Sequence, residues 1–130
     1  MVAYDSARFQ PPAPVAMATL RNPSTGAVGA DVPMLLDTGA DVSLVPTTVV
    51  RQIGVAPVAG QHYQLIAFDG TISFAPVVQL ELVFCRRTFR GQFLLIDEDS
   101  GILGRNVLNA LPLLLDGPRL VWEEYRLPSP

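Results

Sequence analysis

Apolar and polar residues alternate in short runs along most of this chain, and glycine or proline separates one run from the next. Strand-like runs cover 15–20 and 32–36, and the turn-forming sequence Asn-Pro-Ser-Thr-Gly at 22–26 lies between them. This pattern predicts a first hairpin whose second strand ends at Asp37. A shorter alternating segment at 42–45 predicts a third strand.

The middle of the chain has the pattern of one long hairpin, at 61–84. Asp69-Gly70 supplies a strong two-residue turn signal between its two alternating arms. Pro76 interrupts the return strand and predicts an edge or a bulge, because proline lacks the N–H that a central ladder requires. Such a hairpin is either a lid over a cleft or an ordinary surface hairpin, and the sequence does not separate the two.

Two short helices and further strands complete the expected elements. Pro46 and Gly54 frame a segment at 49–53 that predicts one or two helical turns, and the apolar periodicity at 107–111 predicts a second helix. Additional strands are expected at 89–96, 113–115 and 120–122. About eight to ten short strands with one or two short helices are typical of a single all-β domain.

Composition restricts the possible classes of function. The chain has 130 residues, of which 49% are hydrophobic, and this suits one globular domain without the ~18-residue apolar run of a membrane span. A formal charge of −3 argues against the excess of basic residues that nucleic-acid-binding proteins carry. Cys85 and His62 each stand alone, which excludes an internal disulfide and argues against a zinc site. We expect neither a metal nor a cofactor.

The ends of the chain differ from its middle. Residues 1–12 lack periodicity and are expected to form an arm, ordered only where a neighbouring chain or a sheet edge captures it. The expected domain covers 13–125, and 126–130 form a tail. The first residues lack the basic and apolar regions of a signal peptide, which predicts a cytoplasmic protein.

The chemistry-bearing stretch is Leu-Leu-Asp-Thr-Gly-Ala-Asp at 35–41. A carboxylate at the inner end of an apolar strand is costly to bury unless it is hydrogen-bonded, paired or used, which makes Asp37 a candidate. The Thr38 hydroxyl both donates and accepts, and Gly39 permits a tight turn and the close approach of another backbone. Taken alone, the triplet fits ordinary turn chemistry as well as a functional site.

A second motif distinguishes these two interpretations. Ile-Leu-Gly-Arg-Asn at 102–106 precedes the second predicted helix, and 67 residues separate Asp37 from Gly104. With the hairpin between them, the two motifs make residues 14–115 resemble the retroviral-type aspartic proteases, the retropepsin family. The resemblance implies an acid-protease-like closed barrel of the single-lobe retropepsin type.

The resemblance also implies roles for individual residues. In that family each subunit contributes one Asp-Thr-Gly triplet, so Asp37 would be the catalytic carboxylate. Thr38 would interlock with the partner's equivalent loop, and Gly39 would present its backbone to substrate. Asp41 matches a position that pairs with the arginine after the second glycine motif, here Arg105. The hairpin tip around 68–71 would be the flap. We expect substrate-binding roles for Ala40, Asp41, Ile66, Phe68, Asp69, Gly70 and Ile102, with Leu35 and Val42 in the apolar lining, and structural support from Gly104 and Arg105.

Asp99-Ser100-Gly101 also spells an aspartic-protease-like triplet. We reject it as a second site because Asp97-Glu98 precedes it instead of an apolar strand, and because the chain is too short for two lobes. One triplet predicts a C2 homodimer with two copies of Asp37. Two like charges in one site keep one proton between them, so one carboxylate is a general base on water and the other a general acid.

Two features depart from the viral enzymes. The hairpin tip lacks their glycine-rich sequence, and the segment at 113–125 is a full hairpin, longer than the viral C-terminal strand. The latter resembles non-viral relatives, including the retropepsin-like domain of DNA-damage-inducible ubiquitin-shuttle proteins, and would move the dimer interface to that hairpin. The implied function is a homodimeric aspartic endopeptidase that cleaves beside apolar side chains. The alternative is a catalytically silent retropepsin-like peptide-binding or dimerisation module, which the atypical tip favours.

Overall fold

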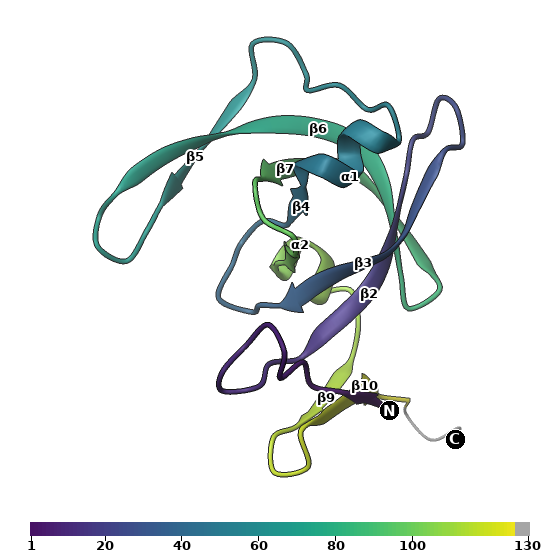
Figure 1. Ribbon diagram of the computed structural model, residues 1–130, viewed down its shortest axis with the longest axis vertical. Helices are drawn as coiled ribbons and strands as arrows, with labels where there is room; N and C mark the ends of the chain where they lie inside the picture. The colour runs from purple at the N-terminus through teal and green to yellow at the C-terminus, as the bar shows by residue number, and fades with distance from the viewer. Residues whose placement is uncertain (127–130) are drawn as a thin grey trace.

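The computed structural model describes residues 1–126, which form ten strands and two short helices (Figure 1). The strands are β1 (Val2–Ala3), β2 (Val15–Arg21), β3 (Val28–Leu36), β4 (Leu44–Pro46), β5 (His62–Ile66), β6 (Ile72–Phe84), β7 (Arg87–Ile96), β8 (Gly101–Leu103), β9 (Leu113–Asp116) and β10 (Val121–Glu124), and the helices are α1 (Thr47–Gln52) and α2 (Arg105–Leu108). The predicted tail at 126–130 falls outside the described residues except for its first residue.

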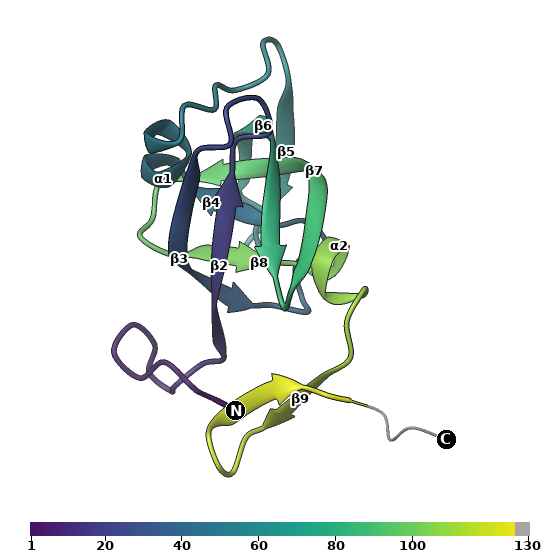
Figure 2. The same cartoon turned by 90° about the vertical axis from the view of Figure 1, so that its right-hand side faces the viewer.

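Six of the strands close into a barrel. The hydrogen-bonded order is β2-β3-β8-β4-β7-β6, and β2 also pairs with β6, which completes the ring. Figure 2 shows these strands wrapped around a common interior. Closing a sheet on itself removes the unpaired edges that would otherwise promote aggregation. The structure confirms the all-β, single-lobe barrel that the sequence predicts.

The alternation of apolar residues decides which side chains enter the barrel. On β6, Val78 and Leu80 are buried and Gln79 between them is exposed. Ala18 and Leu20 on β2 are buried in the same core. Each fully buried leucine stabilises the fold by about 2 kcal/mol relative to an exposed one, so the barrel interior is the main source of stability.

Trp122 joins the C-terminal hairpin to the barrel. Its side chain is buried and belongs to the same core, and its indole N–H donates to the Val15 carbonyl oxygen at 3.2 Å. Its ring centroid lies 6.0 Å from that of Phe84, with the two planes tilted. A buried tryptophan needs a partner for its N–H, and Val15 supplies it.

Both helices begin earlier than the sequence predicts. α1 starts at Thr47 instead of 49, because Pro46 is the N-cap with an extended backbone that suits a helix start, and Gly54 follows the helix with φ +77°, a common left-handed end. α2 starts at Arg105 instead of 107. The Leu108 N–H donates to the Gly104 carbonyl oxygen at 2.9 Å, so the glycine motif sets its start.

Pro76 lies where β6 changes partners. The outer part of β6 pairs with β5, ending at His62 opposite Pro76, and from Val77 onward β6 pairs with β7. Proline is tolerated at this junction because β6 changes its hydrogen-bonding partner there, from β5 to β7. Beyond Pro76 the β5–β6 hairpin extends from the barrel as an arm (Figure 1).

The connection between β6 and β7 is a two-residue turn with unusual residues. Cys85 and Arg86 adopt φ values of +51° and +62°, and Phe84 faces Arg87 across the turn. Left-handed conformations at both central positions are typical of the type I′ turns that match the twist of a hairpin. Neither residue is the asparagine or glycine that such turns favour, so the turn is strained.

A buried ion pair crosses the adjoining strands of the barrel. The Glu81 side chain on β6 is only 6% exposed, and its carboxylate accepts from the Arg21 Nε at 2.8 Å. Arg90 on β7 approaches the second carboxylate oxygen at 2.5 Å. Two guanidinium groups compensate one buried carboxylate, which satisfies both of its oxygens.

The termini form a separate three-stranded sheet in the order β1-β10-β9, below the barrel in Figure 1. β1 lies in the predicted arm, and the Tyr4 N–H extends this pairing by donating to the Leu120 carbonyl oxygen at 2.8 Å. Among residues 1–126, β9 pairs on one side only. Leu114 and Leu115 on β9 are 44% and 46% exposed.

Among residues 1–126, neither helix is long and apolar enough to cross a membrane.

Candidate active site

Asp37 is the first residue after β3. β3 and β8 run parallel with Leu36 opposite Leu103, and the Asp37 N–H continues the ladder to the Leu103 carbonyl oxygen at 3.0 Å. The Asp37 Oδ1 accepts from the Gly39 N–H at 3.0 Å. Asp37 is half-buried, whereas Thr38 and Gly39 are exposed. The backbone therefore fixes one carboxylate at the rim of the barrel, at the end of a strand whose inner residues are buried.

Gly104 brings β8 against the loop that follows Asp37. A Cβ at position 104 would lie 2.9 Å from the Ala40 carbonyl oxygen and would collide with the Val42 carbonyl group. The next N–H, that of Arg105, donates to the same Ala40 oxygen at 2.8 Å. Glycine is required here by the close approach of two backbones, since any side chain would push the loop away from β8.

Arg105 supports the Asp-Thr-Gly turn directly. Its guanidinium Nη1 donates to the Thr38 carbonyl oxygen at 2.7 Å. The pairing of Arg105 with Asp41 that the sequence suggested is absent from the ion pairs of residues 1–126, and Asp41 is exposed. The guanidinium group of Arg105 therefore binds the Thr38 carbonyl oxygen and not the Asp41 carboxylate. A hydrogen bond from a charged guanidinium is stronger than one between neutral groups.

Two residues that the sequence analysis missed complete this support. Ser43 is buried, with 1% of its surface exposed. Its hydroxyl oxygen accepts from the Gly104 N–H at 2.9 Å, and the hydroxyl donates to the Asn106 Oδ1 at 2.7 Å. One hydroxyl thus bridges the strand after Asp37 to the start of α2. The signal in the sequence was a polar residue between the apolar Val42 and Leu44.

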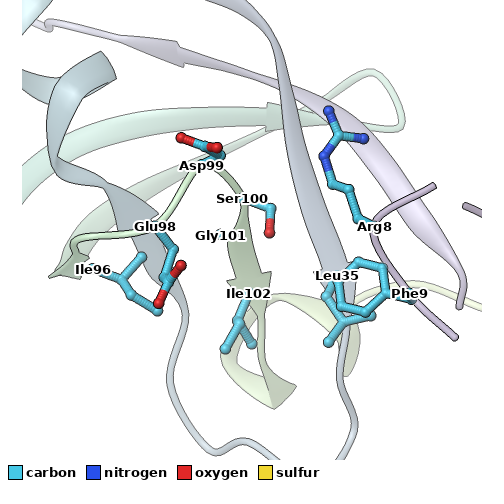
Figure 3. A pocket seen from close by; sticks show the side chains of 9 residues that line it. All are labelled: Arg8, Phe9, Leu35, Ile96, Glu98, Asp99, Ser100, Gly101 and Ile102. Atoms are coloured by element: carbon cyan, nitrogen blue, oxygen red, sulfur yellow. The ribbon is translucent and has the colours of Figure 1, made fainter.

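A cavity of about 450 Å³ opens beside β3 and β8 (Figure 3). Leu35 and Ile102 lie directly opposite each other in the β3–β8 register and line it. Leu35 and Asp37 are two residues apart, so their side chains leave the chain on the same side. The other lining residues are Arg8, Phe9, Ile96, Glu98, Asp99, Ser100 and Gly101. The rejected Asp-Ser-Gly triplet is thus part of the cavity wall.

Other residues expected to bind substrate lie away from that cavity lining. Ala40 and Asp41 follow the Asp37 turn, and Val42 packs beside Leu44 in a small cluster with Ile102. None of them is among the residues that line the cavity. The structure therefore brings Leu35 and Ile102 together at the cavity and leaves Ala40, Asp41 and Val42 in the loop that follows Asp37.

The tip of the β5–β6 hairpin stands apart in the single chain. Ile66 is 70% exposed and Phe68 is completely exposed. Asp69-Gly70 forms the turn as the sequence suggests, with Gly70 at φ +85° and the Asp69 Oδ1 accepting from the Thr71 N–H at 2.9 Å. Hydrogen bonds from Thr71 hold the pKa of the Asp69 carboxyl below its usual range. No hydrogen bond among residues 1–126 joins this tip to the Asp37 loop.

Metal-ligating side chains do not gather at this site. Within the described residues, no three His, Cys, Asp or Glu side chains are grouped so that they could hold a metal ion. Cys85 lies in the β6–β7 turn, where burial and the nearby Glu124 raise the pKa of its thiol to about 11. The chemistry available beside Asp37 is that of carboxylate, hydroxyl and backbone groups.

Comparison with known proteins identifies the class to which this fold and turn belong. The model of the aspartyl protease family matches residues 25–107, which include the Asp37 turn and the Gly104 motif. No curated protein sequence matches the chain. Among solved structures, the chain is similar to EIAV protease complexed with the inhibitor HBY-793, with 21% identity and a TM-score of 0.56 over 84% of this chain and 93% of that chain.

The chain belongs to the aspartyl protease family, and its fold is that of the retropepsin-like, single-lobe members. The resemblance read from the two sequence motifs is thereby confirmed. Family and fold together support an aspartic protease function.

Proposed function

We propose that this protein is a homodimeric aspartic endopeptidase and that its C-terminal hairpin marks it as a non-viral member of its family. The observation that carries the proposal is the setting of Asp37. Its carboxylate accepts from the Gly39 N–H, and Arg105 and Gly104 fasten the same turn to β8 and α2. So much support for one exposed turn suits a carboxylate that must be held in a fixed orientation.

Two copies are needed because one chain supplies one suitable carboxylate. Asp99 precedes β8, whereas Asp37 follows Leu36, which lies opposite Leu103 at the other end of β8. The length of β8, roughly 7 Å or more, therefore separates the two residues, which is too far for their carboxylates to share a proton. A twofold axis beside the exposed Thr38 and Gly39 would instead bring two Asp37 side chains together, with Thr38 interlocking across the axis.

The proposed chemistry follows from two like charges in one site. The pair of Asp37 carboxylates holds a single proton, because ionising both at close range is costly. The ionised member takes a proton from water as its oxygen attacks the peptide carbonyl carbon, and the protonated member donates to the carbonyl oxygen. The carboxyl group that took the water proton then protonates the amide nitrogen. The other carboxylate takes a proton back from a hydroxyl group of the tetrahedral intermediate, and the C–N bond breaks.

The β5–β6 hairpin is proposed as the flap over this site. Ile66, Phe68, Asp69 and Gly70 would cover a bound peptide, with Ala40 and Asp41 at the floor and Ile102 in the apolar cavity. The support is an exposed apolar tip on an arm that extends from the barrel. Exposed apolar side chains on such an arm are costly in water and suit contact with apolar substrate residues.

The dimer interface is proposed to include the terminal sheet. β9 offers an open edge with consecutive leucines, of which Leu114 and Leu115 are exposed. Antiparallel pairing of two β9 strands about a twofold axis would place leucine against leucine and would cover both edges. Leu115 lies opposite Trp122, and Trp122 lies opposite Val2, so the three side chains share one face of the terminal sheet. Pairing of two β9 strands would extend this apolar face across the dimer.

The test replaces the carboxylate at equal size. Asp37→Asn should lower peptide-cleavage kcat/KM by at least about a hundredfold, because the general acid–base pair is lost. The matched control is Asp31→Asn, the same change on an exposed residue of β3, which should cleave like the wild type. Equal cleavage by the Asp37→Asn protein and the wild type would refute the proposal.

The hairpin tip keeps a second function in consideration. Phe68 is fully exposed, and among residues 1–126 no hydrogen bond joins the tip to the Asp37 loop. This favours a silent module that binds peptide or dimerises without turnover. Recovery of a bound peptide intact after long incubation at several pH values would support the silent module, and cleaved product would rule it out.

A further inference from the structure

The floor of the cavity in Figure 3 is apolar and belongs to the barrel. Leu35 and Ile102 come from neighbouring strands and are half-buried. Leu35 shares its side of β3 with Asp37. A substrate side chain that reaches this floor therefore lies next to the peptide bond that Asp37 would act on.

One wall of the cavity comes from a segment outside the barrel. Arg8 and Phe9 lie along one side of the cavity, and Ile96 and Glu98 lie along the other (Figure 3). Arg8, Glu98 and Asp99 are exposed, so the charges stand at the mouth. Phe9 is half-buried and is the one aromatic ring among the lining residues.

The loop that carries Phe9 is held as a closed unit. Asp5 and Ala13 pair at its base, with the Asp5 N–H donating at 2.8 Å and the Ala13 N–H at 3.1 Å to each other's carbonyl oxygens. The Asp5 Oδ1 accepts from the N–H groups of Ala7 and Arg8, both at 2.9 Å. The Asp5 Oδ2 accepts from the Arg8 guanidinium at 2.6 Å.

This arrangement gives Phe9 a fixed position. The loop carries its own hydrogen bonds, so its conformation does not depend on an occupant of the cavity. The same Arg8 hydrogen bonds hold the pKa of the Asp5 carboxyl below its usual range, which keeps Asp5 ionised in mildly acid solution. A rigid aromatic wall opposite a rigid floor limits the size of the side chain that fits between them.

We propose that Phe9 determines specificity by setting the upper size limit of the apolar substrate side chain that the cavity accepts. This inference rests on the proposed peptidase function of the same site. An apolar pocket discriminates by volume, and one methylene too many or too few changes selectivity by roughly 10- to 200-fold. Removing the ring should therefore admit larger side chains at the expense of smaller ones.

The experiment uses the full chain and labelled peptides that differ only in having Ala, Leu, Phe or Trp at one central position. In Phe9→Ala, the ratio of kcat/KM for the Trp peptide to that for the Ala peptide should rise by roughly tenfold or more. Phe9→Trp should lower that ratio. Met17→Ala, which trims an exposed apolar residue on β2, is the matched control and should leave it unchanged.

A binding measurement separates this inference from the proposed function. Each Phe9 variant is also made with Asp37→Asn, and fluorescence anisotropy ranks the same peptides without turnover. Phe9→Leu keeps an apolar contact should the alanine variant fail to fold, and circular dichroism checks all of them.

Each outcome then bears on one idea. Cleavage by the wild type with a ratio that stays within about twofold in every Phe9 variant would overturn the role of Phe9 and leave the peptidase intact. Absence of cleavage by the wild type would overturn the peptidase. The role of Phe9 would then be supported by a shift of the anisotropy ranking toward Trp, and overturned by an unchanged ranking or by no binding of any peptide.

Discussion

Ser43→Ala tests how the turn that carries Asp37 is held to the rest of the barrel. The serine hydroxyl is buried and bridges two groups, the Gly104 N–H at 2.9 Å and the Asn106 Oδ1 at 2.7 Å. Alanine keeps the backbone and the Cβ but removes the bridge. Gly104 is itself buried, so its N–H would lose its partner where water cannot easily replace it.

The expected cost follows from the unequal exposure of the two partners. An unsatisfied buried N–H costs about 1–3 kcal/mol, whereas Asn106 is exposed and can turn to water at about 0.5 kcal/mol. Ser43→Ala should therefore lower the free energy of unfolding by about 2 kcal/mol. For a chain of this length, a loss of that size lowers the thermal midpoint by about 7 °C.

Urea and thermal unfolding at equal protein concentration measure this loss. The matched control is Asn106→Ala, which leaves the bond between Ser43 and Gly104 in place and should cost less than about 1 kcal/mol. If both residues act through one bridge, the double variant should cost less than the sum of the two single variants. A Ser43→Ala protein within about 0.5 kcal/mol of the wild type, or a larger loss in Asn106→Ala, would refute the bridge as described.

Two further predictions concern the β6–β7 part of the barrel. Arg86→Gly should raise the free energy of unfolding by about 1 kcal/mol and the midpoint by about 4 °C, because glycine adopts φ +62° without a Cβ clash; a lower midpoint in calorimetry would contradict the strain. The hydrogen bond from Arg21 holds the pKa of Glu81 below its ordinary value of 4.5. Ionised Glu81 therefore stabilises the fold above pH 4.5, and this contribution is lost as the pH falls through the lowered pKa. The midpoint of Glu81→Gln should lie below that of the wild type at neutral pH and approach it in acid, so a gap that widens on acidification would contradict the ion pair.

The parts of the fold that follow from local patterns could be predicted from the sequence. Alternation located the strands of the barrel except β8, whose three residues are too few to show it, and Asp69-Gly70 located the hairpin turn. Both signals act between neighbouring residues, so tertiary packing has little to change. Helix bounds were less accurate, because Pro46 and Gly104 set the helix starts and the apolar periodicity that guided the prediction does not.

The site was only partly predictable for a related reason. The spacing of Asp37 and Gly104 indicated that the two motifs act together, and the β3–β8 register places them side by side. The resemblance implied Asp41 as the partner of Arg105, whereas the guanidinium donates to the Thr38 carbonyl oxygen, a backbone group that only the folded turn places within reach. Phe9 lies in a segment without periodicity, so only the tertiary structure could place it at the cavity.

The parallel pairing of β3 with β8 also determines when the site can form during folding. The Asp37 N–H bonds to the carbonyl oxygen of Leu103, and the turn after it is fastened by Gly104 and Arg105. Contacts so distant along the chain must close a long loop before they return any stabilisation, which makes them late events in folding. During synthesis the Asp37 turn therefore stays unsupported until nearly the whole barrel has emerged. A chain that stops before β8 carries the acid but none of the backbone that orients it.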